Sequence, residues 1–127
     1  MSYDWKQFFK FSKNLYKDTS LDIDDITKER VVVSRAYYAA FHYADDFLTF
    51  REIKTLNYGG EHDKVIRSLK NTKDPELIKL GLNLERAKKN RTIADYKDKF
   101  ILNKRDVEKH LKITGEIIRN IEEIVAR

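Results

Sequence analysis

The chain of 127 residues contains no cysteine, one proline and four glycines. Without cysteine it can form neither disulfides nor thiolate metal sites, which fits a reducing, cytoplasmic setting. A single proline and few glycines leave few positions that would interrupt long helices. No stretch approaches 18 uncharged apolar residues, so no membrane-spanning helix is expected. These absences favour a helical protein without a membrane anchor.

The length of the chain predicts one domain over residues 1–127, large enough to bury roughly two thirds of its unfolded surface. Its first residues contain neither a basic segment nor an apolar one, so no signal peptide is expected. Hydrophobic residues make up 41% of the chain and aromatic residues 12%. This composition is typical of a folded protein rather than a disordered one.

The net charge of +5 is unevenly distributed along the chain. Residues 64–112 contain 15 basic and 7 acidic side chains, a net charge of +8, which leaves −3 for the rest. A basic half favours a polyanionic partner such as RNA or DNA. The alternative is that these lysines simply form a solvated helical surface.

Apolar residues recur at helical spacing through most of the chain, and no alternating strand pattern reaches a convincing length. The pattern predicts five helices over about residues 2–17, 25–50, 61–70, 74–96 and 104–126. Asp74 followed by Pro75 is a strong helix start, and Asn103 can cap the last helix. The fourth helix either continues through residues 91–96 or breaks within them. The glycine-containing segment 57–60 separates the second helix from the third. The expected fold is all-α, an antiparallel bundle of four to five helices.

Residues 34–42, with the sequence SRAYYAAFH, are the most informative segment of the chain. The second helix is apolar almost all round from residue 36 to residue 44, which places it at the centre of the bundle. Arg35 and His42 are seven positions apart, so they point within roughly 20° of each other, about 10 Å apart along the axis. A guanidinium on a central helix must be paired or line a polar cleft.

Two motifs together carry a resemblance to a known family. The segment 34–42 resembles the Arg-Ala-Tyr-Tyr-Ala-x-Phe-His helix of one branch of the HEPN family of small prokaryotic helical domains. Residues 91–96, RTIADY, resemble that branch's Arg-x-x-(Ser/Ala)-Asp-Tyr segment. The resemblance covers about residues 28–125, and the first motif is the more specific of the two.

The resemblance implies a helical bundle that forms a homodimer. Many HEPN proteins are metal-independent endoribonucleases that act as toxins of toxin–antitoxin systems or in phage defence. Their hallmark is an arginine followed, after four to six residues, by a histidine, and the candidate catalytic residues here are Arg35 and His42. Histidine can transfer protons near neutral pH, and arginine can hold a phosphate through two hydrogen bonds.

Further site residues follow from the same resemblance and from the basic region. Lys88, Lys89 and Arg91 are candidates for holding RNA phosphates. His62, Asp95 and Tyr96 are candidates for supporting positions. Neither a cofactor nor a metal is expected, because the chain has no cysteine and no two histidines at the i, i+4 spacing of a helical zinc site.

Several alternatives remain open on the sequence alone. The segment after Arg91 contains no histidine, which favours a non-catalytic HEPN module that binds a nucleotide, a nucleic acid or a nucleotidyltransferase-type antitoxin protein. In such pairs the partner can modify a tyrosine, and Tyr96 is the matching candidate. A helical adaptor is the remaining function class.

Each of these side chains can also have a purely structural role. His42 can be a core histidine, Arg35 can form a clamp with Asp95, and the tyrosines of the second helix can be core residues. His62 can cap the turn before its helix. His110, among lysines on the last helix, is expected at the surface.

Overall fold

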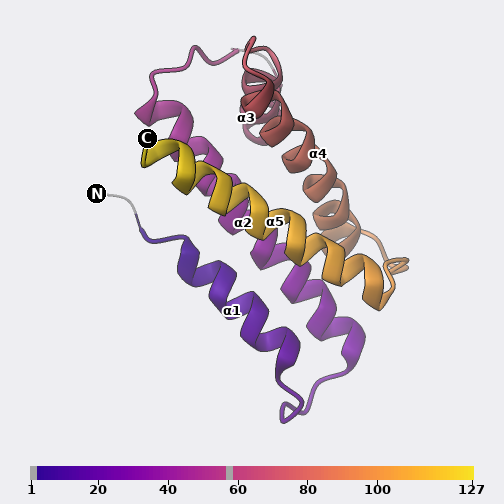
Figure 1. Ribbon diagram of the computed structural model, residues 1–127. Helices are drawn as coiled ribbons and strands as arrows, with labels where there is room; N and C mark the ends of the chain where they lie inside the picture. The colour runs from indigo at the N-terminus through magenta and orange to yellow at the C-terminus, as the bar shows by residue number, and fades with distance from the viewer. Residues whose placement is uncertain (1–2, 57–58) are drawn as a thin grey trace.

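The computed structural model describes residues 3–56 and 59–127 and contains five helices (Figure 1). Their bounds are α1 Lys6–Lys17, α2 Asp25–Phe50, α3 Glu61–Lys70, α4 Pro75–Tyr96 and α5 Lys104–Val125. No strand occurs within those described ranges, so the prediction of an all-helical bundle is confirmed. No helix in the described part of the chain is long and apolar enough to cross a bilayer.

The ends of the helices follow from local side-chain hydrogen bonds. Asp24 accepts a hydrogen bond from the backbone of Thr27 at 2.7 Å, which satisfies one free N–H at the start of α2. Asp74 does the same for Glu76 at the start of α4, with proline in the first helical turn as expected. Asn103 opens α5 with a capping box. The first helix begins at Lys6, later than predicted, and Ser2 lies outside the described residues.

α2 is the central element and contacts each of the other four helices. α1 and α4 run in the opposite direction to α2 and α5 (Figure 1). From Ala36 to Ala44 no residue of α2 is exposed, which confirms that this segment is central. α4 continues unbroken to Tyr96, so residues 91–96 are helical.

The short helix α3 packs closely on α4 because α4 carries glycine at position 81. A Cβ atom there would meet the side chain of Lys70 at 2.8 Å and that of Leu69 at 3.1 Å. The main core lies between α2, α3, α4 and α5. A smaller cluster around Val32, Val33 and Val107 lies at the other end of α2.

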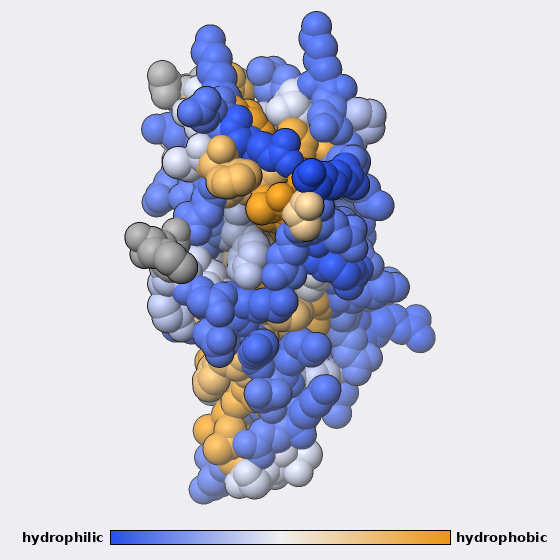
Figure 2. Space-filling view, turned by 60° about the vertical axis from the view of Figure 1, so that its left-hand side comes forward, coloured by the Kyte–Doolittle hydropathy of each residue, from blue (hydrophilic) through white to orange (hydrophobic). Residues whose placement is uncertain are grey.

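The surface is mostly hydrophilic, with scattered apolar side chains. Figure 2 brings forward the left-hand side of Figure 1 and shows apolar patches on an otherwise hydrophilic face. The exposed large apolar side chains include Phe11 on α1, and Leu21, Ile23 and Ile26 around the link from α1 to α2. Exposed apolar residues are common on protein surfaces.

Candidate functional site

One stripe along α2 is only partly covered by the rest of the protein. Arg35, Tyr38 and His42 recur at spacings of three and four, so they lie along one side of α2. Arg35 is exposed, whereas Tyr38 and His42 are half-buried. We call these three residues the polar stripe of α2. The unbroken helix supports the expectation that Arg35 and His42 point to the same side.

His42 is held in place by an aromatic stack. Its ring lies parallel to the indole of Trp5, with centroids 3.7 Å apart and an interplanar angle of 9°. Burial lowers the pKa of His42, while the carboxylates of Asp45, Asp46 and Glu61 act in the opposite direction. His42 is therefore a half-buried histidine on the polar stripe of α2, and its ring nitrogens make no hydrogen bond to any of the described residues.

His62 brings a second histidine to the same place from α3. Its Nδ1 lies 2.7 Å from the Tyr37 hydroxyl, and its ring contacts Phe41 with centroids 4.1 Å apart. Burial and, secondarily, the charge of Arg91 lower the pKa of His62, and burial raises that of Tyr37. Both shifts favour the neutral pair. With the phenol as the donor to Nδ1, the imidazole carries its hydrogen on Nε2. Neutral His62 then offers an N–H donor at Nε2.

Arg91 of α4 lies among three tyrosine rings. Its guanidinium carbon is 5.3 Å from the ring centroid of Tyr37 and 5.6 Å from those of Tyr38 and Tyr96. The residue is only 6% exposed, and its Nε has no hydrogen-bond partner. One terminal nitrogen donates to the Tyr96 hydroxyl at 3.4 Å. We call Arg91 with Tyr37, Tyr38 and Tyr96 the tyrosine cage.

Asp95 neutralises this arginine only weakly, and it does not pair with Arg35. The nearest oxygen of Asp95 lies 3.8 Å from Arg91, one turn away on α4, which is long for a charged hydrogen bond. The expected clamp between Arg35 and Asp95 is therefore wrong. Arg35 is exposed, so solvent already compensates its charge. The buried cation that requires compensation is Arg91.

The two candidate phosphate-binding lysines differ from each other. Lys88 donates to Asp63 of α3 at 2.6 Å, and that bond is the main cause that lowers the pKa of the Asp63 carboxyl. Lys89 is exposed and takes part in none of the ion pairs found among the described residues. A groove of about 400 Å³ between α3 and α4 is lined by both lysines. Of the two, Lys89 is the one free to contact a ligand.

His110 is fully buried, so the expectation that it lies at the surface is wrong. Its Nε2 donates to the backbone carbonyl of Val33 at 2.8 Å, and its Nδ1 accepts from the Asn90 side chain at 3.2 Å. Burial lowers the pKa of His110 to about 4. Both ring nitrogens are satisfied in the neutral form, which makes this histidine a structural link between α2, α4 and α5.

Sequence spacing contained a signal for both buried polar residues. His110 lies three positions after Val107 and seven before Ile117, which places it on the apolar face of α5. Arg91 lies seven positions after Leu84 and three before Ala94, on the apolar face of α4. Local charge suggested exposure, because lysines surround both residues. The helical period was the signal that could have indicated their burial, and the expectation for His110 followed the local charge instead.

The comparisons with known proteins add no family. No family model matches the chain, and neither a curated protein nor a solved structure matches it. Within residues 3–56 and 59–127, no group of three or more histidine, aspartate or glutamate side chains is placed to hold a metal ion. The candidate site is therefore defined by its own residues: the polar stripe of α2, His62 and the tyrosine cage.

Proposed function

We propose that this chain is an HEPN-type RNA-targeting protein, a metal-independent endoribonuclease of a toxin–antitoxin or phage-defence system. The single observation that supports the proposal most is the incompletely neutralised guanidinium of Arg91 beside the polar stripe of α2. A buried cation without close ion pairing is a strong attractor for an anion such as a phosphate. His62, whose pKa the charge of Arg91 lowers, and His42 on the polar stripe supply the proton-transfer groups.

The reaction uses the 2′-hydroxyl of RNA as the nucleophile. A base removes the 2′-hydroxyl proton, O2′ forms a bond to phosphorus, the bond from phosphorus to O5′ breaks, and an acid protonates O5′. The products are a 2′,3′-cyclic phosphate and a 5′-hydroxyl. His42 is the proposed proton-transfer group, and its lowered pKa keeps a neutral, basic fraction near pH 7. Arg35 and Arg91 are the proposed phosphate contacts.

A homodimer would supply the second proton-transfer group. Two copies of the polar stripe, related by a two-fold axis, bring two copies of His42 and Arg35 to one cleft. His62 is a supporting group in this scheme, because its Nε2–H can donate to a phosphate oxygen while Tyr37 holds Nδ1. Asp95 and Tyr96 border the bound phosphate.

Cleavage of a defined RNA tests this proposal. We expect EDTA-resistant cleavage with 2′,3′-cyclic phosphate ends, and a rate lowered about 10²- to 10⁴-fold by His42→Ala. Arg91→Met should also lose cleavage, whereas the control Arg86→Met, on the exposed side of the same helix, should retain it. Cleavage abolished by EDTA, or unchanged in both His42→Ala and Arg91→Met, would contradict the proposal.

A second candidate function has its own observation. Tyr96 is 70% exposed at the end of α4, and its hydroxyl lies beside the Arg91 guanidinium. A partner of the nucleotidyltransferase type could reach this phenol, and Arg91 could hold the phosphate of the transferred nucleotide. RNA binding without any cleavage, together with a nucleotide mass added in wild type but not in Tyr96→Phe, would favour this non-catalytic module.

A further inference from the structure

A second basic site lies between α1 and α5, away from the tyrosine cage. The groove has a volume of about 360 Å³. It is lined by residues from both helices: Phe9, Lys13, Tyr16, Lys17, Leu111, Lys112, Gly115, Glu116 and Arg119. Lys13 and Lys17 lie outside the basic region 64–112 that the sequence singled out. The two helices place them opposite Lys112 and Arg119.

The charge of this groove is strongly positive and is not neutralised within the protein. Its four cations face one carboxylate, Glu116. The ion pairs found among the described residues involve none of these five side chains. Four exposed cations on the walls of one groove create a positive potential that attracts a polyanion.

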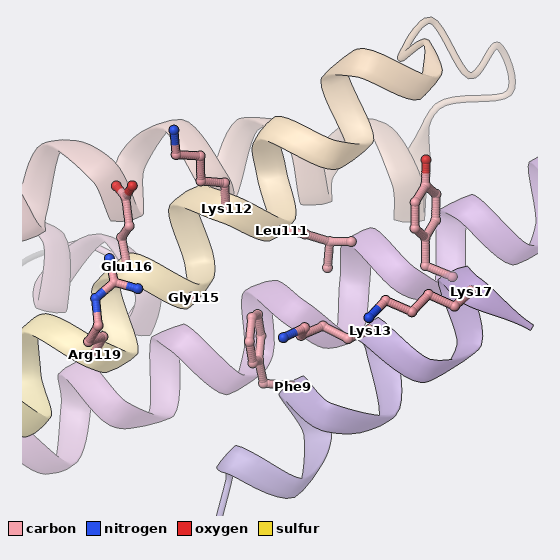
Figure 3. A pocket seen from close by; sticks show the side chains of 9 residues that line it. Phe9, Lys13, Lys17, Leu111, Lys112, Gly115, Glu116 and Arg119 are labelled. Carbon is pink, nitrogen blue, oxygen red and sulfur yellow. The ribbon is translucent and has the colours of Figure 1, made fainter.

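The floor of the groove is aromatic. Figure 3 shows the Phe9 ring standing between Lys13 and the backbone of α5 at Gly115. Glycine is required for this approach, because a Cβ atom at position 115 would lie 2.8 Å from Cζ of Phe9. The Lys13 ammonium is 5.6 Å from the centre of the same ring. Tyr16 adds a second ring to the lining.

We propose that the α1–α5 groove binds a single strand of RNA, with the four cations on its phosphates and the apolar floor against a base. Cations that follow a backbone beside aromatic surface are the usual composition of sites for single-stranded nucleic acid. An acidic peptide would use the charge but not the rings. This inference rests on the proposed RNA-targeting function and adds a second contact surface for the same substrate.

Two charge reversals test the groove against a matched control. Lys13→Glu/Lys112→Glu changes the groove, while Lys73→Glu/Lys79→Glu makes the same change of net charge at exposed positions outside it. Binding of a fluorescent single-stranded RNA is measured by anisotropy over a range of salt concentrations. Circular dichroism checks that both variants remain helical.

We expect the groove variant to bind at least about tenfold more weakly. The slope of log affinity against log salt concentration should be smaller in magnitude by about 1.4, because two phosphate contacts are lost and each contributes roughly 0.7 to the slope. The control variant should keep the slope of the wild type. Polyglutamate of equal charge should compete at least tenfold less well than unlabelled RNA.

Each contrary result has a distinct meaning. If the wild type binds RNA and the groove and control variants lose the same amount of affinity, the groove is not the RNA-binding site. The proposed function is unaffected by that result. Equal competition by polyglutamate overturns RNA as the occupant in favour of an acidic partner. No RNA binding by the wild type at low salt overturns the proposed function, and this inference falls with it.

Discussion

His110 and Arg91 are both buried polar residues, but their surroundings are opposites. His110 has a hydrogen-bond partner on each ring nitrogen and is neutral because burial lowers its pKa to about 4. Arg91 is charged, has an Nε without a partner, and lies 3.8 Å from its nearest carboxylate. A buried polar group whose hydrogen bonds are all formed within the protein has a structural role. Incomplete satisfaction indicates a place where a ligand can complete the bonding.

The largest expected effect on stability comes from replacing His110. His110→Ala leaves a cavity and deprives the Val33 carbonyl of its donor, so the free energy of unfolding should fall by about 2–4 kcal/mol. His110→Gln, which retains an N–H donor, should lower the free energy of unfolding by less than His110→Ala does. Urea denaturation measures both. A loss below about 0.5 kcal/mol for His110→Ala would remove the structural role assigned to this histidine.

The pH dependence of stability should follow from the same residue. The pKa of His110 is about 4 in the folded protein against an ordinary value of 6.5, so the unfolded chain binds more protons between these values. The contribution of neutral His110 to the free energy of unfolding is complete above about pH 6.5. It is lost as the pH falls toward 4, and the loss is on the order of 3 kcal/mol. The difference between wild type and His110→Gln isolates it. A difference that is constant over this range would contradict the assignment.

Arg91→Met should have a much smaller effect on stability than His110→Ala. Replacing a buried, poorly paired ion by an apolar side chain is often close to neutral, so we expect a change within about 1 kcal/mol. RNA affinity should nevertheless fall at least tenfold, because the proposed phosphate contact is removed. A loss of 3 kcal/mol or more in urea denaturation would make Arg91 a structural residue like His110.

The smallest effect is expected for Asp95→Asn. A partly exposed pair at 3.8 Å contributes less than about 0.5 kcal/mol to stability. The substitution should raise RNA affinity two- to fivefold, because the carboxylate competes with phosphate for Arg91. Asp98→Asn, just beyond the helix, controls for the change in net charge. Weaker RNA binding by Asp95→Asn than by this control would argue against a phosphate at Arg91.

The sequence predicted the helices well because their determinants are local. The spacing of apolar residues and the capping groups Asp24, Asp74 and Asn103 act within a few residues of each helix end. The start of α1 was the least accurate boundary. The start signal there is Asp4, whose side chain accepts a hydrogen bond from the backbone N–H of Lys6 at 3.2 Å, and the expected start near residue 2 overlooked it.

The candidate site was only partly predictable, because its geometry joins three helices. The sequence indicated the polar stripe of α2. It also indicated His62 and Arg91 as separate candidate site residues. It paired Asp95 with the wrong arginine, since the burial of Arg91 and the exposure of Arg35 depend on how α4 packs against α2. The tyrosine cage likewise requires Tyr37 and Tyr38 to meet residues more than 50 positions away.

By itself the sequence determined that this protein is helical, where its helices lie, and that α2 is central. Hydrogen bonds between near neighbours and the 3.6-residue period are sufficient for that. Only the tertiary structure decided which polar groups are satisfied and which are not. Burial, partners and the α1–α5 groove all arise from surfaces that meet only when the helices pack, so no local pattern of residues contains them.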